Sequence, residues 1–104
     1  MERTAYVYFM ASSNNNVLYT GVTTNLPLRI WQHKNISNPD SFTAKYNCHK
    51  LVYVEYTSSI RAAIVREKQL KSWKREWKNS LIEEVNPNWM DMSDDWLDSG
   101  SSPE

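Results

Sequence analysis

The sequence predicts a small α/β domain of the α+β type, in which helices flank a three-stranded sheet in the order ββαβαα. Two runs rich in aromatic and β-branched residues, residues 6–11 (YVYFMA) and 17–23 (VLYTGVT), are separated only by SSNNN. This pattern is typical of a β-hairpin with a polar turn. A third strand is expected at residues 51–56 (LVYVEY). Because the first two strands are joined so closely, the sheet is predicted to be antiparallel or mixed.

The helix after the hairpin is predicted from its start and stop signals. Thr24 and Asn25 are both residue types that cap helices, and Pro27 is tolerated in a first turn. The helix is expected to end near residue 34, because Asn35 and the polar cluster SNPD follow.

Two more helices are predicted after the third strand. A Ser-Ser pair at 58–59 offers a cap for a helix over residues 60–73. A further helical stretch over residues 74–85 stops at an Asn-Pro pair. No repeat or linker divides the chain, and 104 residues suffice for one hydrophobic core. We therefore expect one domain over residues 1–90.

Charge is unevenly distributed along the chain, although the formal net charge is zero. Residues 1–80 hold all twelve Lys and Arg and five acids, whereas residues 81–104 hold seven acids and no base. A basic body suits a polyanion, but mixed charge also serves solubility, and the pattern leaves both interpretations open. Residues 91–104 are predicted to be an acidic, partly disordered tail. This tail either packs through Trp89 and Trp96 or covers the basic body and inhibits it.

The cysteine count and the apolar pattern bear on the compartment. Cys48 is the single cysteine and cannot form an internal disulfide, and no apolar run is long enough to cross a bilayer. A cytoplasmic protein without a membrane partner is therefore expected. Cys48 and His49 together are a weak metal signal, and a structural role is favoured for the cysteine.

Arg29 and His33 are four residues apart and are predicted to lie on one face of the first helix. An arginine can clamp a phosphate, and a histidine can move a proton near neutral pH. The alternative is an ordinary solvated helix face, although like charges at this spacing repel each other once the histidine is protonated.

Glu67 falls within the apolar stripe of the second predicted helix. One interpretation is an ion pair with a basic neighbour, either Arg66, Lys68 or Lys71. The other is a carboxylate held at a cleft edge as the ligand of a hard cation such as Mg²⁺. Phosphate oxygens and water would then complete the coordination shell.

Tyr8 and Tyr19 lie on neighbouring predicted strands, and sheet pairing can bring their hydroxyls together. Cross-strand packing is the commoner reason for such a pair. Gly21 shares the face of Tyr19 because alternate strand residues point the same way. The missing side chain would let a substrate or another backbone approach closely, but a β-bulge would explain the glycine equally well.

These residues together resemble the GIY-YIG nuclease superfamily. YVY (residues 6–8) stands at the place of that family's first motif, and YTG (residues 19–21) at the place of its second. Arg29 and His33 fall at its helix positions, and Glu67 at its metal-ligand position. The likeness spans about residues 4–96 and is strongest to the small, single-domain bacterial branch.

The chain departs from the family motifs at two positions. Tyr6 replaces the glycine of the first motif, and Thr20 replaces the isoleucine of the second. Both changes leave the tyrosine hydroxyls and Gly21 in place, so they cast little doubt on the implied chemistry.

The resemblance implies a metal-dependent endonuclease that hydrolyses DNA phosphodiester bonds and leaves 5′-phosphate and 3′-hydroxyl ends. One of the two tyrosines would take the proton from water, helped by the histidine, by Lys45 or by the metal ion. The arginine would neutralise the phosphate, and Glu67 would hold Mg²⁺ or Mn²⁺. An asparagine is also implied, with Asn79 as the alternative to Asn86. The predicted catalytic residues are Tyr8, Tyr19, Arg29, His33, Glu67 and Asn86.

Substrate contacts are predicted mainly from basic residues of the second and third helices. Trp73 and Trp77 are interleaved with them and either stack on unpaired bases or pack the helix pair. Cleavage is expected to be structure-selective or weakly sequence-selective, on branched or single-stranded DNA in repair or recombination. The alternative function is a nucleic-acid-binding module of the same fold with little activity without a protein partner. The predicted nucleic-acid-binding residues are Gly21, Lys45, Arg66, Lys71, Lys74 and Arg75.

Overall fold

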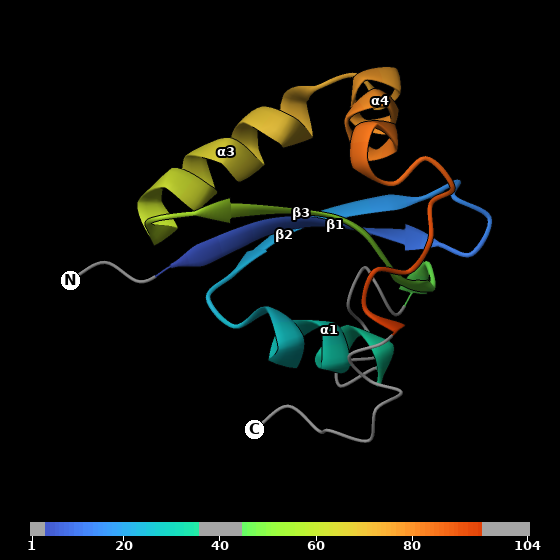
Figure 1. Cartoon of the computed structure of the whole chain (residues 1–104), viewed down its shortest axis with the longest axis horizontal. Helices are drawn as coiled ribbons and strands as arrows, with labels where there is room; N and C mark the ends of the chain where they lie inside the picture. Colours follow the sequence, from blue (N-terminus) through green and yellow to red (C-terminus); the bar gives the residue numbers. More distant parts are fainter. Residues whose placement is uncertain (1–3, 36–44, 95–104) are drawn as a thin grey trace.

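A computed structural model describes residues 4–35 and 45–94 and confirms the predicted α+β order ββαβαα. The elements are, in chain order, β1 (Ala5–Ser12), β2 (Leu18–Thr23), α1 (Leu26–Lys34), β3 (Cys48–Thr57), α3 (Ile60–Ser72) and α4 (Arg75–Val85). The strands form one antiparallel sheet in the order β2-β1-β3. Helix α1 covers one face of this sheet, and α3 and α4 cover the other (Figure 1).

β1 is the central strand and is buried on both faces. Val7 and Phe9 belong to the hydrophobic cluster under α3 and α4, whereas Tyr8 and Met10 belong to the cluster under α1. Alternate residues of a strand point to opposite faces, so burial on both sides explains the near-continuous apolar sequence of β1. The sheet therefore divides the core into two hydrophobic clusters, one under α3 and α4 and the other under α1.

The β1–β2 turn is stabilised by its own side chains. The Ser12 hydroxyl donates to Asn14 Oδ1 (2.8 Å) and accepts from the Val17 amide (3.0 Å). The β1–β2 register continues without a shift, with Tyr8 opposite Gly21. A β-bulge therefore does not explain the glycine, and its reason lies in the packing described below.

The helix starts lie within two residues of the predicted positions. The side chains of Asn25 and Ser59 each accept a hydrogen bond from the backbone amide three residues later. Trp73 and Lys74 have extended backbone conformations, which end α3 and begin α4. Among the described residues, no helix is long and apolar enough to cross a bilayer.

β3 begins at Cys48, earlier than the predicted start at residue 51. Cys48 is buried in the cluster under α1, and this burial raises the pKa of its thiol. Within residues 4–35 and 45–94, no three His, Cys, Asp or Glu side chains gather in a metal-binding group. Packing is thus the role that the structure shows for the cysteine.

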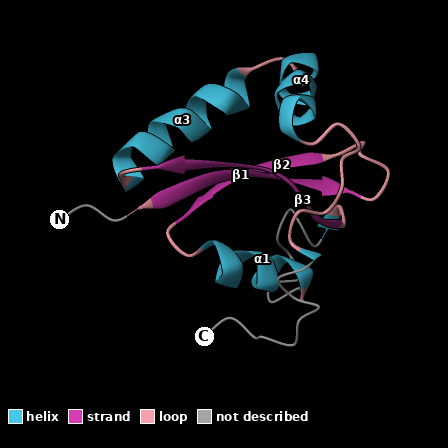
Figure 2. Ribbon diagram, in the orientation of Figure 1, coloured by secondary structure: helices cyan, strands magenta, loops and turns pink. Residues whose placement is uncertain are grey.

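The segment after α4 returns past the end of the sheet toward α1 (Figure 2). Asp91 accepts a hydrogen bond from the Leu51 amide (3.2 Å) and forms an ion pair with Lys34 of α1. The Met92 amide donates to the Leu51 carbonyl (2.7 Å). The first residues of the predicted tail are therefore packed on the body. The remainder of the tail, with Trp96, lies outside the described residues.

Candidate active site

Two tyrosines and a histidine meet on the α1 face of the sheet. The ring centroids of Tyr8 and Tyr19 are 6.1 Å apart, and the His33 ring is 5.8 Å from Tyr8 and 5.3 Å from Tyr19. The register explains the tyrosine pair, because Tyr8 lies opposite Gly21 and Tyr19 is its diagonal neighbour on the same face. α1 follows β2 after two residues and packs on this face, which brings His33 to the tyrosines.

A buried hydrogen bond links Tyr8 and His33, with 2.9 Å between the hydroxyl and Nε2. Burial and, to a smaller extent, Tyr19 raise the pKa of Tyr8. Burial, Arg29 and His49, in that order, lower the pKa of His33 to about 4. At neutral pH Tyr8 is therefore protonated and His33 is neutral. We assign the hydroxyl as the donor and Nε2 as the acceptor, which puts the imidazole proton on the other ring nitrogen.

Arg29 is the positive charge of this cluster. Hydrogen bonding to the Tyr8 hydroxyl is the main cause that raises the pKa of Arg29, and Tyr19 contributes less. His33 is buried, whereas Arg29 is exposed. The predicted pair is thus divided between the inside and the surface, and a solvated helix face does not describe the histidine.

Gly21 makes room for the two tyrosines. A Cβ at Gly21 would lie 2.6 Å from both Cζ and the hydroxyl oxygen of Tyr8, and 2.8 Å from Cε2 of Tyr19. These distances are far below van der Waals contact, so any side chain here displaces the rings. The close approach expected at this glycine is made by the protein's own tyrosines. Contact between Gly21 and nucleic acid stays a prediction.

Glu67 comes from the opposite side of the sheet. Its side chain, 16% exposed, lies on the α3 stripe between Ala63 and Leu70 and forms an ion pair with Lys71 at 3.4 Å. The ion-pair interpretation therefore holds for Lys71, while a metal-binding role stays a prediction. α3 packs on β1 and β2, and β2 is an edge strand. The strand that carries Tyr19 on one face thus supports the helix of Glu67 on the other.

The two asparagine candidates have structural contacts. Asn86 is buried, and its Nδ2 donates to the carbonyls of Val52 (3.0 Å) and Met90 (2.9 Å). Its Oδ1 accepts from the Met90 amide (3.0 Å). Asn79 accepts a hydrogen bond from Nε of Arg75 (2.8 Å). Asn86 therefore ties the end of α4 to β3, and a catalytic role for either residue stays a prediction.

Two of the predicted nucleic-acid-binding residues are engaged by the protein itself. Arg66 forms a forked pair with Glu55, in which both N–O distances are 2.9 Å. Arg75 donates to the carbonyl oxygens of Asn15 and Asn16 and so holds the β1–β2 turn. These guanidinium groups have structural partners, which leaves them less able to meet a phosphate.

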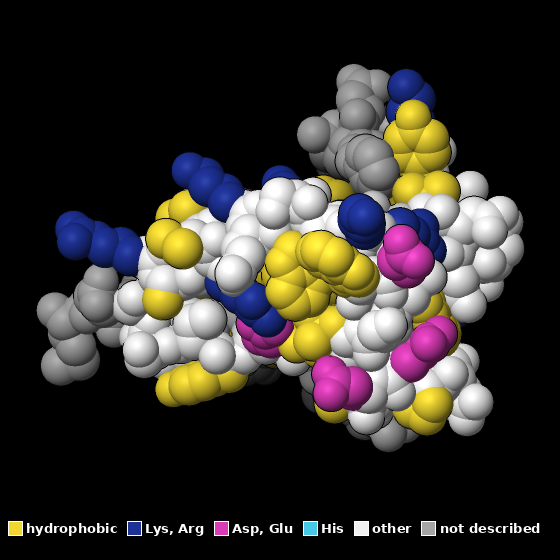
Figure 3. Space-filling model, turned by 90° about the horizontal axis from the view of Figure 1, so that it is seen from above, with side chains coloured by type: hydrophobic (Ala, Val, Ile, Leu, Met, Phe, Trp, Pro, Cys, Tyr) yellow, Lys and Arg dark blue, Asp and Glu magenta, His cyan; other side chains and the backbone are white. Residues whose placement is uncertain are grey.

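Two of the predicted lysines, Lys45 and Lys74, lie near aromatic rings on the surface. Nζ of Lys45 is 5.8 Å from the ring centroid of Tyr46, and Nζ of Lys74 is 5.7 Å from that of Trp77. Trp73 and Trp77 pack edge to face at 6.2 Å, and Trp77 stays exposed. Hydrophobic side chains gather in the middle of this outer face, with both basic and acidic side chains around them (Figure 3). Trp73 therefore packs against the core cluster, whereas Trp77 contacts it from a surface of mixed charge, and stacking of either ring on a base stays a prediction.

His49 belongs to the surroundings of the cluster but was absent from the predicted site. The sequence pairs it with Cys48 as a weak metal signal, whereas the structure places it where it contributes to the lowered pKa of His33. The sequence did not indicate this position, because the polar residues 47–50 (NCHK) do not suggest a strand. In the structure β3 begins at Cys48.

Comparisons with known proteins show the family to which the chain is related. The family described as the GIY-YIG catalytic domain matches residues 4–80. A UPF0213 protein of Staphylococcus haemolyticus is 39% identical over 79 residues, which cover 76% of this chain and 94% of that protein. A UPF0213 protein of Haloquadratum walsbyi is 37% identical over 79 residues, which cover 76% of this chain and 86% of the relative.

A solved structure shows the same fold. The solution structure of a UPF0213 protein from Bacillus halodurans matches with a TM-score of 0.53 at 24% identity, covering 83% of this chain and 89% of that one. At this identity the likeness concerns the fold alone. The family match, however, extends over most of the chain and includes both tyrosines, Arg29, His33 and Glu67. The chain therefore belongs to the GIY-YIG domain family.

Proposed function

We propose that the protein is a metal-dependent endonuclease that hydrolyses DNA phosphodiester bonds, with its proton-transfer groups on the α1 face of the sheet. Membership of a family described as a catalytic domain supports nuclease activity. The observation that carries the proposal is the buried hydrogen bond between Tyr8 and neutral His33, next to partly exposed Tyr19 and exposed Arg29. This arrangement offers a proton acceptor and an anion-binding charge in one place, as phosphodiester hydrolysis requires.

We assign the contact with the attacking water to Tyr19, because Tyr8 is 0% exposed and Tyr19 is partly exposed. The water oxygen attacks phosphorus while one water proton passes to the Tyr19 oxygen. The Tyr19 proton passes to Tyr8, and the Tyr8 proton passes to Nε2 of His33. The bond from phosphorus to the 3′-oxygen breaks, and that oxygen takes a proton from solvent. The products are a 5′-phosphate and a 3′-hydroxyl.

This path avoids a free tyrosinate. The raised pKa of Tyr8 makes an isolated phenolate costly, whereas a relay leaves both tyrosines neutral when the transfer is complete. His33 is a weak acceptor while its pKa stays near 4, partly because of the Arg29 charge. A phosphodiester anion bound at Arg29 opposes that charge and raises the pKa of His33 toward its ordinary value. The substrate therefore strengthens the base that acts on it.

Mg²⁺ or Mn²⁺ is part of the proposal, with Glu67 as the residue that holds it. A single, mostly buried carboxylate fits a cation that takes its remaining ligands from phosphate oxygens and water. An ion held there would supply positive charge to phosphate oxygens. The 3.4 Å pair with Lys71 is long for a charge-assisted hydrogen bond, so the carboxylate is only loosely held by its present partner.

A nucleic-acid-binding module with little activity alone is the second candidate. The observation that favours it is the position of α3, the helix that carries Glu67, on the side of the sheet opposite α1, which separates the proposed metal ligand from the proton-transfer groups. A partner protein would then complete the site or bring it to DNA. In either case we propose a cytoplasmic role in DNA repair or recombination, on branched or single-stranded DNA.

Incubation with supercoiled plasmid and with branched and single-stranded oligonucleotides, with and without Mg²⁺ or Mn²⁺, tests the proposal. For the nuclease, cleavage needs the metal and is lost in both Tyr19→Phe and Glu67→Gln. Tyr56→Phe is the matched control, because Tyr56 is an exposed tyrosine near the C-terminal end of β3. DNA binding without cleavage supports the binding module. Cleavage that survives in both site variants contradicts the assigned site.

A further inference from the structure

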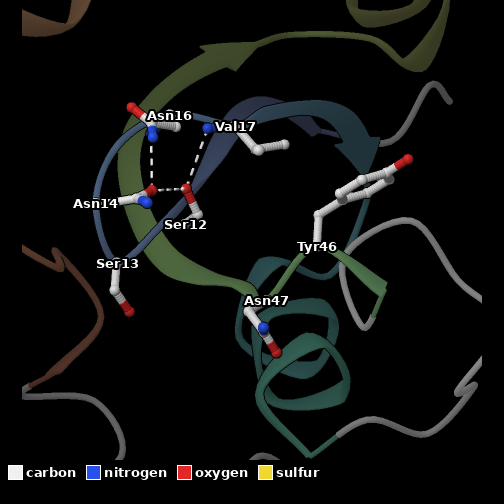
Figure 4. A pocket seen from close by; sticks show the side chains of 7 residues that line it. All are labelled: Ser12, Ser13, Asn14, Asn16, Val17, Tyr46 and Asn47. Atoms are coloured by element: carbon white, nitrogen blue, oxygen red, sulfur yellow. Dashed lines mark hydrogen bonds between the residues drawn. The ribbon is translucent and has the colours of Figure 1, made fainter.

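A pocket of about 350 Å³ lies between the β1–β2 turn and the residues that precede β3. The turn, from Ser12 to Val17, forms one side, and Tyr46 and Asn47 form the other (Figure 4). Val17 also packs in the hydrophobic cluster that contains Tyr8 and Tyr19. Since Val17 precedes Tyr19 by two residues on the same face, the pocket begins about 7 Å along the strand from the proposed catalytic tyrosine.

The lining combines one aromatic ring with neutral hydrogen-bonding groups. Tyr46 is 44% exposed, and hydroxyl and amide side chains account for most of the other lining residues, with no charged side chain among them. A phosphate would find no counter-charge among the described residues that line the pocket. A neutral, planar heterocycle would find a ring for stacking and amides that match the edges of a nucleobase. The volume lies at the lower end of the range of small-ligand sites, roughly 300–1,000 Å³, which suits one nucleoside.

Two of the residues that line the pocket, Asn16 and Asn47, have side-chain amides available for a ligand. The side chains of Asn16 and Asn47 make no hydrogen bond to another residue in the described part of the chain. Asn47 has a left-handed backbone, φ 57°, where glycine is the easiest residue to place. Asparagine tolerates that conformation and keeps an amide at the pocket.

The wall that carries Asn16 is held in place before any ligand arrives. Asn14 Oδ1 accepts from the Ser12 hydroxyl (2.8 Å) and from the Asn16 amide (3.1 Å), as the dashed lines of Figure 4 show. Arg75 of α4 donates to the Asn16 carbonyl (2.9 Å). A preorganised wall loses little conformational entropy on binding, which favours recognition over loose contact.

Lys45 supplies the charge that the pocket lacks. It is exposed, and its Nζ lies 5.8 Å from the Tyr46 ring centroid. A base stacked on Tyr46 would therefore carry its own phosphate toward a cation at the pocket's edge. Charge outside and neutral polar groups inside is the distribution that a nucleotide requires.

We propose that this pocket holds the base of a nucleotide next to the scissile phosphate, stacked on Tyr46 and hydrogen bonded by Asn16 and Asn47. The inference rests on the proposed nuclease function and adds a selectivity to it. A base in a duplex cannot enter without leaving its stack and its partner, which costs a few kcal/mol. The pocket therefore selects substrates with an unpaired nucleotide beside the cleavage point.

Equilibrium binding without a divalent metal tests the pocket separately from catalysis. The probes are a fluorescein-labelled single-stranded oligonucleotide, its duplex, and a set with one abasic residue at each successive position. Tyr46→Ala is expected to weaken single-strand binding roughly ten-fold or more, with duplex binding changed far less. Tyr46→Phe should keep the ring and therefore the affinity. Tyr56→Ala removes an exposed tyrosine near the C-terminal end of β3, away from the pocket, and should leave binding unchanged. One abasic position weakens binding to the wild type and loses its effect in Tyr46→Ala.

An NMR titration of the wild-type protein needs no variant. Addition of a deoxynucleoside 5′-monophosphate is expected to shift the side-chain amide signals of Asn16 and Asn47. Metal-dependent cleavage together with no abasic-sensitive position and no amide shift overturns the pocket and leaves the nuclease proposal intact. Amide shifts and Tyr46-dependent binding without any cleavage retain the nucleotide site and reject the catalytic proposal. Neither binding nor amide shifts overturns both.

Discussion

The two faces of the sheet use the same residue types in opposite ways. On the α1 face, tyrosine and histidine rings form a buried, internally hydrogen-bonded cluster and leave Arg29 exposed beside it. On the α3–α4 face, Arg66 is locked in a fork on Glu55, which also accepts a 2.5 Å hydrogen bond from Tyr53. Within the described part of the chain, Arg29 lies among neutral groups, whereas Arg66 is paired with Glu55.

This difference appears in the pKa values. Hydrogen bonding to Arg66 is the main cause that lowers the pKa of Glu55, so charge on that face is balanced within the protein. On the other face, burial and the unbalanced Arg29 lower the pKa of His33. Charge is thus compensated where it supports the fold and left uncompensated where a substrate anion would complete it. Four changes test this division.

Arg29→Ala should have the largest effect, because it removes the uncompensated charge. We expect kcat/KM for DNA cleavage to fall about 10²–10³-fold, as for other groups that stabilise developing charge. The free energy of unfolding should change by no more than about 0.5 kcal/mol, since the residue is exposed. Cleavage kinetics and urea unfolding measure the two quantities. Arg61→Ala, an exposed arginine of α3, is the matched control, and an equal loss of cleavage there would contradict the division of the faces.

His33 should make the stability of the protein depend on pH. Its pKa is about 4 in the fold and near 6.5 in an unfolded chain, so the unfolded state binds more protons between these values. The free energy of unfolding is therefore highest above about pH 6.5. It decreases by up to ~3 kcal/mol as the pH falls from 6.5 toward 4. Urea unfolding at a series of pH values and an NMR titration of the imidazole measure it.

His33→Gln serves as the control for this pH dependence and should flatten the curve between pH 6.5 and 4. Glu55 and Asp91 also have lowered pKa values, but carboxylates lose their stabilising charge at more acidic pH. An imidazole that titrates near 6.5 in the folded protein would show that the cluster is open to water. The relay through Tyr8 would then lose its support.

Gly21→Ala should damage both the fold and the chemistry of the α1 face. The new Cβ would lie 2.6 Å from the Tyr8 ring, and Tyr8 is fully buried and bonded to His33, so it has little room to retreat. Overpacking of this kind costs about 1–3 kcal/mol, and we expect at least a tenfold loss of cleavage. Thr20→Ala, on the other face of the same strand, is the control. Unchanged cleavage in Gly21→Ala would mean that the tyrosine pair need not keep its geometry.

The order of the elements could be predicted because its signals are local. The polar turn, the cap at Asn25 and the cap at Ser59 each act within a few residues of their own position. The pairing of Arg29 with His33 also follows from helix geometry alone. The sequence predicted a close approach at Gly21 but not which group makes it. The Tyr8 ring fills that space, and it comes from β1, which the strand register places opposite Gly21.

The basic residues show where such prediction stops. Arg75 was expected to meet nucleic acid, yet its guanidinium donates to the carbonyl of Asn16, 59 positions earlier in the chain. Asn86 was expected to be catalytic, yet its amide bonds to the carbonyl of Val52 on β3. A sequence shows a charge or an amide but not whether a remote carbonyl already occupies it. Partners of this kind appear only after the chain has folded.

Arg66→Met should have the smallest effect, and it tests the compensated face. The substitution removes the fork on Glu55 while keeping an apolar stem over Trp73, whose ring centroid lies 5.2 Å from the guanidinium carbon. Because the pair is only partly buried, we expect a loss of stability of about 1 kcal/mol or less. Affinity for DNA and cleavage should stay within about threefold of the wild type, since the guanidinium is engaged before any substrate arrives.

The double variant Arg66→Met/Glu55→Gln sharpens this test. If Arg66 serves only to balance Glu55, removing both charges should restore part of the stability lost in the single variant, because no unpaired carboxylate remains on α3's side of the sheet. If Arg66 instead contacts phosphate, DNA affinity should fall equally in both variants and its salt dependence should decrease by about one ion. That second outcome would make the α3–α4 face part of the substrate path and end the distinction between the two faces.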